Sequence, residues 1–193
     1  MLPRFLSGVK WFSLLLKYDM DLAEEAQLEG CGLCGAQLHQ AHYQRKPRGG
    51  PAEMDEDDWR RFSFCCYVCR KRTTPVSFRF FGRRVYFGAI MVLISAMLGG
   101  VSPRRREALH RLCGADQRTL ERWRQWWAEE FPQTDVWRIV SPRLALAGVP
   151  TDSIPRQLLR HFLQQGCSLA RALRRVLRLL LPLTTLPRRG GPG

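Results

Sequence analysis

The segment RFSFCCYVCRKRTTP, residues 61–75, contains three cysteines within five positions and then three consecutive basic residues. Cys66 and Cys69 have C-x-x-C spacing, and an earlier pair, Cys31 and Cys34, has the same spacing. A C-x-x-C turn holds two thiolates at the separation that tetrahedral zinc requires, and two such turns close a four-cysteine site. The sequence therefore predicts a structural Zn2+ site formed by Cys31, Cys34, Cys66 and Cys69.

Other roles for these cysteines remain open at this stage. His39 and His42 follow Cys34 closely, so a site formed by Cys31, Cys34 and the two histidines is an alternative. Either pair could instead be a thioredoxin-like redox motif, although no βαβ pattern surrounds it, or a pair of buried thiols without metal. Cys65 points to the other side of the expected strand and is interpreted as a bystander.

The residues on both sides of the second cysteine pair predict short strands. Phe62 and Phe64 alternate with other residues before it, and Phe78 and Phe80 repeat the alternation after it, as half-buried strands do. Residues 39–51 are polar and contain proline and glycine, which predicts a loop between the two cysteine pairs.

Downstream of the cysteines the pattern becomes helical. Residues 83–98 are mostly apolar and predict a buried helix that ends at Gly99. Residues 104–127 read as a helix, a turn at Gly114 and a longer helix capped by Asp116, which is the layout of a helix-turn-helix. With the apolar helix upstream, these elements predict a trihelical unit.

The expected fold class is mainly α, with a small β zinc ribbon followed by a trihelical helix-turn-helix and C-terminal helices. Prolines interrupt residues 132–154, and apolar residues at helical spacing return from Ile154 to Leu181, with Gly166 between two helices. The predicted segments are an N-terminal helix at 1–27, the zinc ribbon at 28–82, the helix-turn-helix domain at 83–131, and a linker with C-terminal helices at 132–193.

The charge of the chain indicates a polyanionic partner. The formal net charge is +14, and residues 70–124 alone carry 13 basic and 3 acidic residues. Such a balance favours nucleic acid, with arginines contacting phosphates and the N-terminal end of the second helix reading bases. The candidate residues for contact with double-stranded DNA are Arg70, Lys71, Arg72, Arg83, Arg84, Arg104, Arg105, Arg106, Gln117, Arg118, Thr119 and Arg122.

Over residues 28–130 the chain resembles the N-terminal zinc-ribbon/helix-turn-helix module of bacterial insertion-sequence transposases. The resemblance is carried by CGLCG at 31–35, by CCYVCRKR at 65–72 and by the helix pair that follows. It implies a zinc ion on the four cysteines and binding to transposon-end or related DNA. We do not expect the catalytic domain of such enzymes, because only 66 residues follow Trp127 and they lack strand patterns. We therefore expect a short transposase-like protein of a mobile element that is not an enzyme.

The sequence also carries expectations about location and partners. No signal peptide is recognised, and clustered cysteines suit a reduced compartment, so a cytoplasmic protein is expected. Besides DNA, the C-terminal helices could mediate self-association or bind a separate transposase subunit, and no small-molecule substrate is expected. Two alternatives stay open: a membrane-associated basic protein that uses 85–101 or 154–181, and a zinc-stabilised module that binds another protein.

Overall fold

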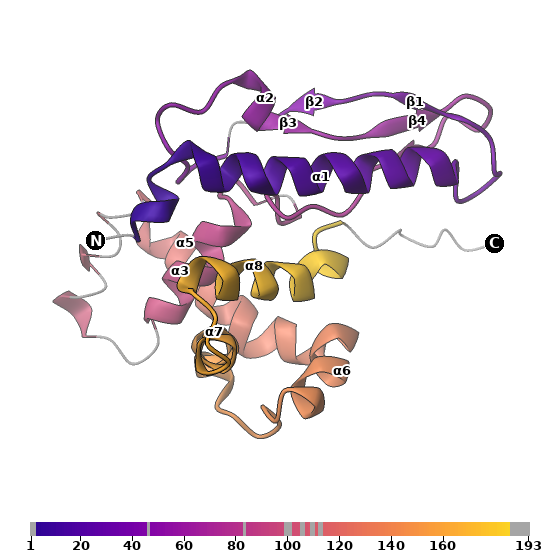
Figure 1. Ribbon diagram of the computed structural model, residues 1–193. Coiled ribbons are helices and arrows are strands. Elements are labelled where there is room, and N and C mark those ends of the chain that lie inside the picture. The colour runs from indigo at the N-terminus through magenta and orange to yellow at the C-terminus, as the bar shows by residue number, and fades with distance from the viewer. Residues whose placement is uncertain are drawn as a thin grey trace.

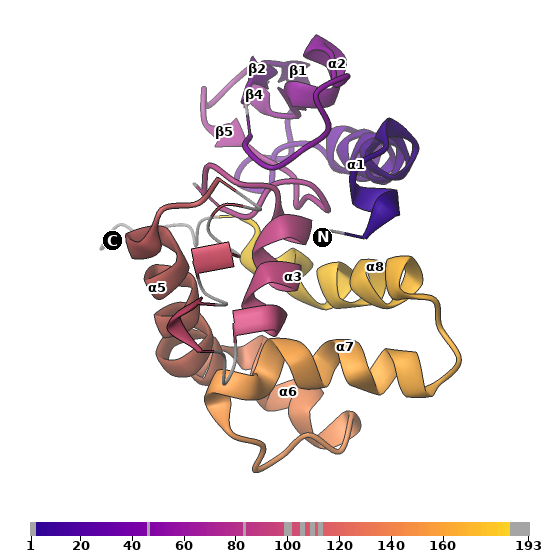
Figure 2. The same cartoon turned by 90° about the vertical axis from the view of Figure 1, so that its left-hand side faces the viewer.

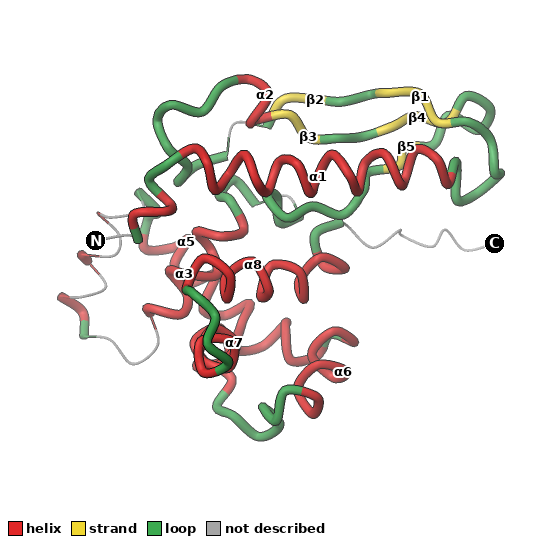
Figure 3. Tube along the Cα trace, in the orientation of Figure 1, coloured by secondary structure: helices red, strands yellow, loops and turns green. Residues whose placement is uncertain are grey.

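The computed structural model describes residues 3–45, 47–82, 84–98, 102–104, 107–108, 111 and 114–185. The described part of the chain is mainly helical, with 58% of its residues in helices and 9% in strands, and its strands pair in small antiparallel sheets. This confirms the predicted class at the level of helices with a small sheet, while the zinc ribbon and the helix-turn-helix stay predictions. Figures 1 and 3 show two layers, in which the strands, one long helix and one short helix lie above the other labelled helices.

Helix α1, Val9–Glu29, is the long helix, and it contributes residues to both hydrophobic cores. It follows a short 3-10 turn at Arg4–Leu6 and begins after Gly8, so the predicted N-terminal helix is present but broken near its start. Phe12 and Leu15 pack into the larger core, whereas Ala23, two turns later, packs into a smaller core beneath the strands. The helix therefore connects the two cores directly.

The strands form two small antiparallel sheets. One has the order β1-β4-β5 and consists of Leu38–Gln40, Phe64–Cys66 and Arg72–Thr73; the other pairs β2, Tyr43–Gln44, with β3, Arg60–Arg61. The predicted strand before the second cysteine pair is present. Two strands also occupy the predicted loop at 39–51, because their partners lie more than fifteen residues away and leave no local signal.

The predicted strand at 75–82 is wrong. Its aromatic residues Phe78 and Phe80 are buried as expected, but the backbone there is not in a strand, apart from an isolated bridge between Phe80 and Phe87. Side chains bind the backbone N–H groups instead. The N–H of Phe78 donates to Asp19 Oδ1 at 2.6 Å, and those of Arg79 and Phe80 donate to Ser77 Oγ.

Helix α3, Gly88–Leu98, is the centre of the larger core, and ten of its eleven residues are buried. Figure 2 shows α5, Gln117–Gln125, on one side of it and the helices α7, Ile154–Gln164, and α8, Leu169–Leu180, on the other. The interpretation of 83–98 as a buried helix is thus confirmed, although the helix starts later than expected. None of the helices in the described part of the chain is both long and apolar enough to cross a membrane.

The C-terminal third matches its prediction in one part and departs from it in another. Helices α7 and α8 are separated at Gly166, which has a left-handed φ of 76°, and they bury their apolar faces. The predicted linker at 132–154, however, contains helix α6, Asp135–Arg143, with short 3-10 turns at Phe131–Gln133 and Thr151–Ser153 on either side of it, and a further turn at Leu181–Leu183 follows α8. Thr134 caps α6, and Pro142 lies in its last turn, where the helix ends one residue later.

A buried ion pair joins the two layers. Arg79, which is fully buried, donates from Nε to Asp19 Oδ2 at 2.8 Å, and Asp19 lies in the middle of α1. The two terminal nitrogens of Arg79 donate to the carbonyls of Asp58 and Arg60, at the end of helix α2, Glu56–Trp59. Sequence analysis missed this pair, because an arginine between phenylalanines resembles the exposed position of an alternating strand.

Candidate metal centre

Both C-x-x-C turns have the same backbone hydrogen bonds. In the first turn Gly35 N–H donates to the carbonyl of Cys31 at 2.8 Å, and in the second Arg70 N–H donates to that of Cys66 at 3.2 Å. Gly35 and Arg70 also share a left-handed backbone, with φ of 70° and 58°. In each turn the first cysteine N–H donates to the carbonyl five residues ahead, so the two turns are matched structures.

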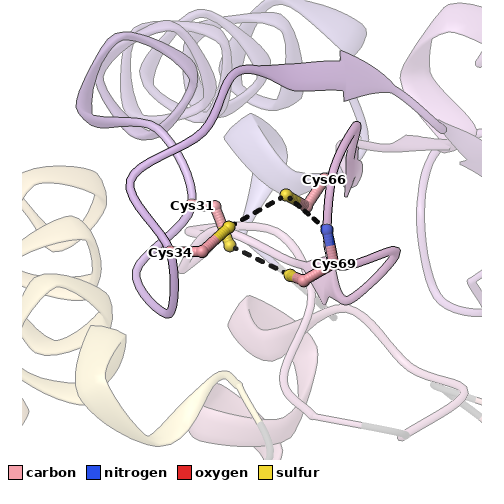
Figure 4. Close-up of side chains that lie close together, drawn as sticks. All are labelled: Cys31, Cys34, Cys66 and Cys69. Carbon is pink, nitrogen blue, oxygen red and sulfur yellow. Dashed lines mark hydrogen bonds between the residues drawn. The ribbon is translucent and has the colours of Figure 1, made fainter.

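These turns bring four sulfur atoms together. The Sγ atoms of Cys31, Cys34, Cys66 and Cys69 all lie within 4.8 Å of one another. Figure 4 shows them converging, with Sγ–Sγ distances of 3.6 Å between Cys31 and Cys69 and 3.5 Å between Cys34 and Cys66. A tetrahedral zinc with bonds of about 2.3 Å needs sulfurs roughly 3.8 Å apart. The four cysteines are therefore close enough to bind a metal ion, and they are the four that the sequence predicted.

The thiols sit in different environments. Cys31 and Cys66 are buried in the smaller core, Cys69 is half-buried and Cys34 is exposed. The backbone N–H groups of Leu33 and Cys34 lower the pKa of the Cys31 thiol to about 6. The N–H of Lys71 lowers the pKa of Cys69, but burial and the neighbouring thiols outweigh it and raise that pKa to about 12. A cation at the centre would favour all four thiolates at once.

The histidine alternative is not formed. His42 Nδ1 lies 2.9 Å from the carbonyl oxygen of Ser63, and its ring packs edge-on against Phe62 and Phe64. His39 stacks on Tyr67 at 5.4 Å. Among the described residues, the group of side chains that could hold a metal comprises the four cysteines alone. Cys65 lies outside this group, with its Sγ near the carbonyls of Cys66 and Arg70, in agreement with its interpretation as a bystander.

The three basic residues after the second turn are exposed beside the cluster. The Arg70 guanidinium lies over the Tyr67 ring at 5.8 Å. Arg72 Nη1 donates to the carbonyl of Ala41 and to Ser63 Oγ, and its guanidinium lies over Tyr43. The carbonyl of Lys71 accepts the N–H of Cys66 as part of the second turn. The backbone of these three basic residues is therefore held next to the cysteine cluster.

The other predicted DNA contacts lie apart from the cluster along the chain, and their surroundings differ. Gln117, Arg118 and Arg122 are exposed on the first turns of α5, whose N-terminus Asp116 caps as predicted by accepting from Thr119 N–H. Thr119 itself, predicted to face outward, is only 7% exposed, because this capping turns it toward the core. The prediction that Thr119 faces outward is therefore wrong.

Arg84 also differs from a free phosphate contact. It is half-buried, and its guanidinium lies over the rings of Phe81 and Trp126 at 4.8 and 4.9 Å. Burial lowers its pKa. Arg104 is exposed. Arg83, Arg105 and Arg106 lie outside the described residues, as does most of the first helix of the predicted helix-turn-helix.

Comparison with known proteins adds no relative. No family model matches the chain, and no curated protein and no solved structure matches it. The resemblance to the transposase module thus rests on the motifs in the sequence.

Proposed function

We propose that this chain is a zinc-stabilised protein that binds double-stranded DNA, of transposase-like origin and without a catalytic domain of its own. Zinc is the metal of choice because four thiolates in a tetrahedral arrangement suit Zn2+ and a closed, structural site. The ion would hold the two turns rigidly, and the cations beside them would contact the phosphate backbone.

One observation carries this proposal: Arg70 occupies a left-handed position. A non-glycine residue there costs about 1–2 kcal/mol, and the matched position of the other turn is Gly35. The arginine makes no ion pair among the described residues and contributes its side chain only to the Tyr67 ring. Backbone strain that no structural contact offsets points to a functional side chain. Arg70 is also exposed and opens residues 70–124, which carry 13 basic and 3 acidic residues, so its guanidinium suits a phosphate.

Helix α5 supports the same partner. Its exposed residues Gln117, Arg118 and Arg122 present donors for adenine, guanine and phosphate, while Leu120 and Trp123 anchor the helix in the core. In helix-turn-helix proteins these first turns are the ones that reach base edges.

The test uses Arg70→Gly, with Ala145→Gly as its matched control. Ala145 is also left-handed, with φ of 53°, and follows helix α6, far from the cysteines in sequence. Both changes should relieve backbone strain and leave the unfolding midpoint equal or higher. Only Arg70→Gly should weaken DNA binding, by about threefold to tenfold in a mobility-shift titration, and it should reduce the slope of log K against log salt by about one.

The wild-type chain should itself show a slope near −5 if about six arginines meet phosphates. A wild-type affinity for duplex DNA that does not change with salt contradicts the proposed function. Equal DNA affinity for Arg70→Gly and the wild type contradicts the role of Arg70.

A second candidate function is favoured by the tips of the two turns. Leu33, Tyr67 and Val68 are the middle residues of the C-x-x-C turns and are between 61% and 66% exposed. Exposed apolar residues that gather at one place are typical of protein-docking surfaces, which agrees with a zinc-stabilised interaction module. The variant Leu33→Ser/Val68→Ser separates the two functions, since it should leave DNA binding and its salt slope unchanged if DNA contacts the arginines.

A further inference from the structure

An open cavity of about 980 Å³ lies between the second half of α1 and the strands. Its walls come from Leu22 on α1, from Tyr43 and Arg61 on β2 and β3, and from Arg72 and Thr74 after the second cysteine turn. A phosphate ion would fill only a small part of this volume, which is in the range of pockets that bind nucleotide-sized molecules.

The floor of this cavity holds a buried arginine without a carboxylate partner. Arg61 is 2% exposed, and its hydrogen bond runs from Nη2 to the carbonyl of Pro75 at 2.5 Å. Burial lowers its pKa to about 10, in spite of the nearby charge of Asp19. A buried guanidinium is costly unless a charged partner offsets its lost hydration.

The nearest carboxylate is already engaged. Arg45, Arg61 and Arg79 place their guanidinium groups around the ring of Phe80, at 5.4, 5.8 and 4.9 Å from its centre. Asp19 is bound by Arg79 and by Ser77, while Arg45 donates to the carbonyls of Gly82 and Arg84. Of the three buried or half-buried cations, one therefore has an acidic partner in the described chain.

The opposite wall has the reverse charge. Glu25 and Glu29, two exposed residues of α1, also line the cavity. They disfavour a ligand that is negative throughout, and they can accept hydrogen bonds from N–H groups. The cavity thus suits a molecule with an anionic end and an amino-bearing end.

We propose that this cavity binds a phosphorylated small molecule of the size of an amino-nucleoside monophosphate, with its phosphate at Arg61 and Arg72 and its amino-bearing end toward Glu25 and Glu29. Of the proposed DNA contacts this site shares Arg72, whereas Arg70 and α5 lie outside its lining, and it differs from the sequence-based expectation of no small-molecule ligand. Guanidinium groups pair with phosphate through two parallel hydrogen bonds, which explains why arginine occupies the floor.

The experiment is a calorimetric titration of the full-length chain with AMP, GMP, inorganic phosphate and adenosine at constant ionic strength. We expect one nucleotide per chain, bound at least tenfold more tightly than inorganic phosphate, and no saturable binding of adenosine. Arg61→Gln and Arg72→Gln should each reduce nucleotide affinity at least tenfold. Arg72 is exposed, so its variant keeps the test valid if Arg61→Gln fails to fold.

Two further variants complete the design. Arg171→Gln, an exposed arginine on α8, should leave nucleotide binding unchanged. Glu25→Gln should weaken nucleotide binding without weakening the binding of inorganic phosphate. The proposal is overturned if no phosphorylated probe gives saturable binding at millimolar concentration, or if Arg171→Gln lowers affinity as much as Arg72→Gln does. Arg70→Gly changes a residue outside the cavity lining, so it should weaken DNA binding and leave nucleotide binding unchanged, and failure of either proposal is recognised separately.

Discussion

The two cores of this protein differ in what can hold them together. The core around the cysteines has six buried members: Ala23, Cys31, Leu38, Phe62, Phe64 and Cys66. The core around α3 contains more than thirty, including five tryptophan and phenylalanine side chains that are no more than 1% exposed. Apolar burial stabilises a fold by about 25 cal/mol per Å2, so the larger core can sustain its helices. The smaller one has little apolar area to offset the entropy of its loops, and a metal ion bound by the four cysteines would contribute folding free energy there.

Removing a sulfur ligand should have the largest effect, and it tests directly whether the two cores differ in what stabilises them. Cys66→Ser should abolish tight zinc binding and expose the amides of residues 31–73 to hydrogen exchange, while α3 stays protected. The measurement is zinc content together with residue-resolved exchange. Cys65→Ser is the matched control, since Cys65 lies outside the cluster, and it should retain one zinc per chain.

Because Cys65 is adjacent, it could replace the missing thiol. The double variant Cys65→Ser/Cys66→Ser removes this route and should contain no zinc. One tightly bound zinc per chain in the double variant would contradict the ligand assignment.

The next effect concerns the junction of the two cores. Arg79→Ala leaves Asp19 as a buried, unpaired carboxylate, which should cost about 3–5 kcal/mol of the free energy of unfolding. Chemical denaturation measures it. Arg60→Gln is the comparison, because the Arg60–Asp57 pair is exposed and is worth at most about 1 kcal/mol. Similar losses in both variants would show that the buried pair carries no special weight.

A large-to-small substitution inside the larger core should destabilise that core and leave the metal centre unchanged. Leu173 on α8 is fully buried, and Leu173→Ala should lower the free energy of unfolding by about 2–5 kcal/mol. Zinc affinity should stay unchanged, because the smaller core around the cysteines has no α8 residue among its described members. A drop in zinc affinity of more than threefold would show that the two cores are coupled more tightly than the contrast implies.

The smallest predicted effect on stability concerns Gly50, at the boundary of the larger core. A Cβ on Gly50 would lie 2.5 Å from Met54 Sδ and 2.6 Å from Phe87 Cε2, so Gly50→Ala should cost about 1–3 kcal/mol through overpacking. The midpoint of thermal unfolding records it. At Gly8 a Cβ would meet nothing within 4 Å, and Gly8→Ala should change stability by no more than about 0.5 kcal/mol.

The metal centre was the part most accessible from sequence. The spacing of Cys31 with Cys34 and of Cys66 with Cys69 is local, and matched turns follow from it. Helix α3 was equally readable, because its apolar composition needs no partner to be recognised. The signals that define these features lie within a few residues.

Features that depend on distant partners were not readable. Strand β1 forms by pairing with β4, some 25 residues later. Arg79 is buried because it pairs with Asp19, a residue 60 positions away in the sequence. Arg61 and Arg45 carry no local signal of burial, and the fold places them around Phe80. Helix α6 was missed because the prolines of residues 132–154 were interpreted as breaks, although Pro142 falls in its final turn.

Helix α1 has a consequence for synthesis on the ribosome. Tyr18 accepts a hydrogen bond from Arg174 Nη1, a partner that follows 156 residues later. At elongation rates of about 5–20 residues per second, Tyr18 waits roughly 8–30 seconds before Arg174 is made. Phe12 gains its neighbour Phe87 earlier in that interval, and the cysteine turns, complete at residue 72, are the first structure that can engage the other end of α1.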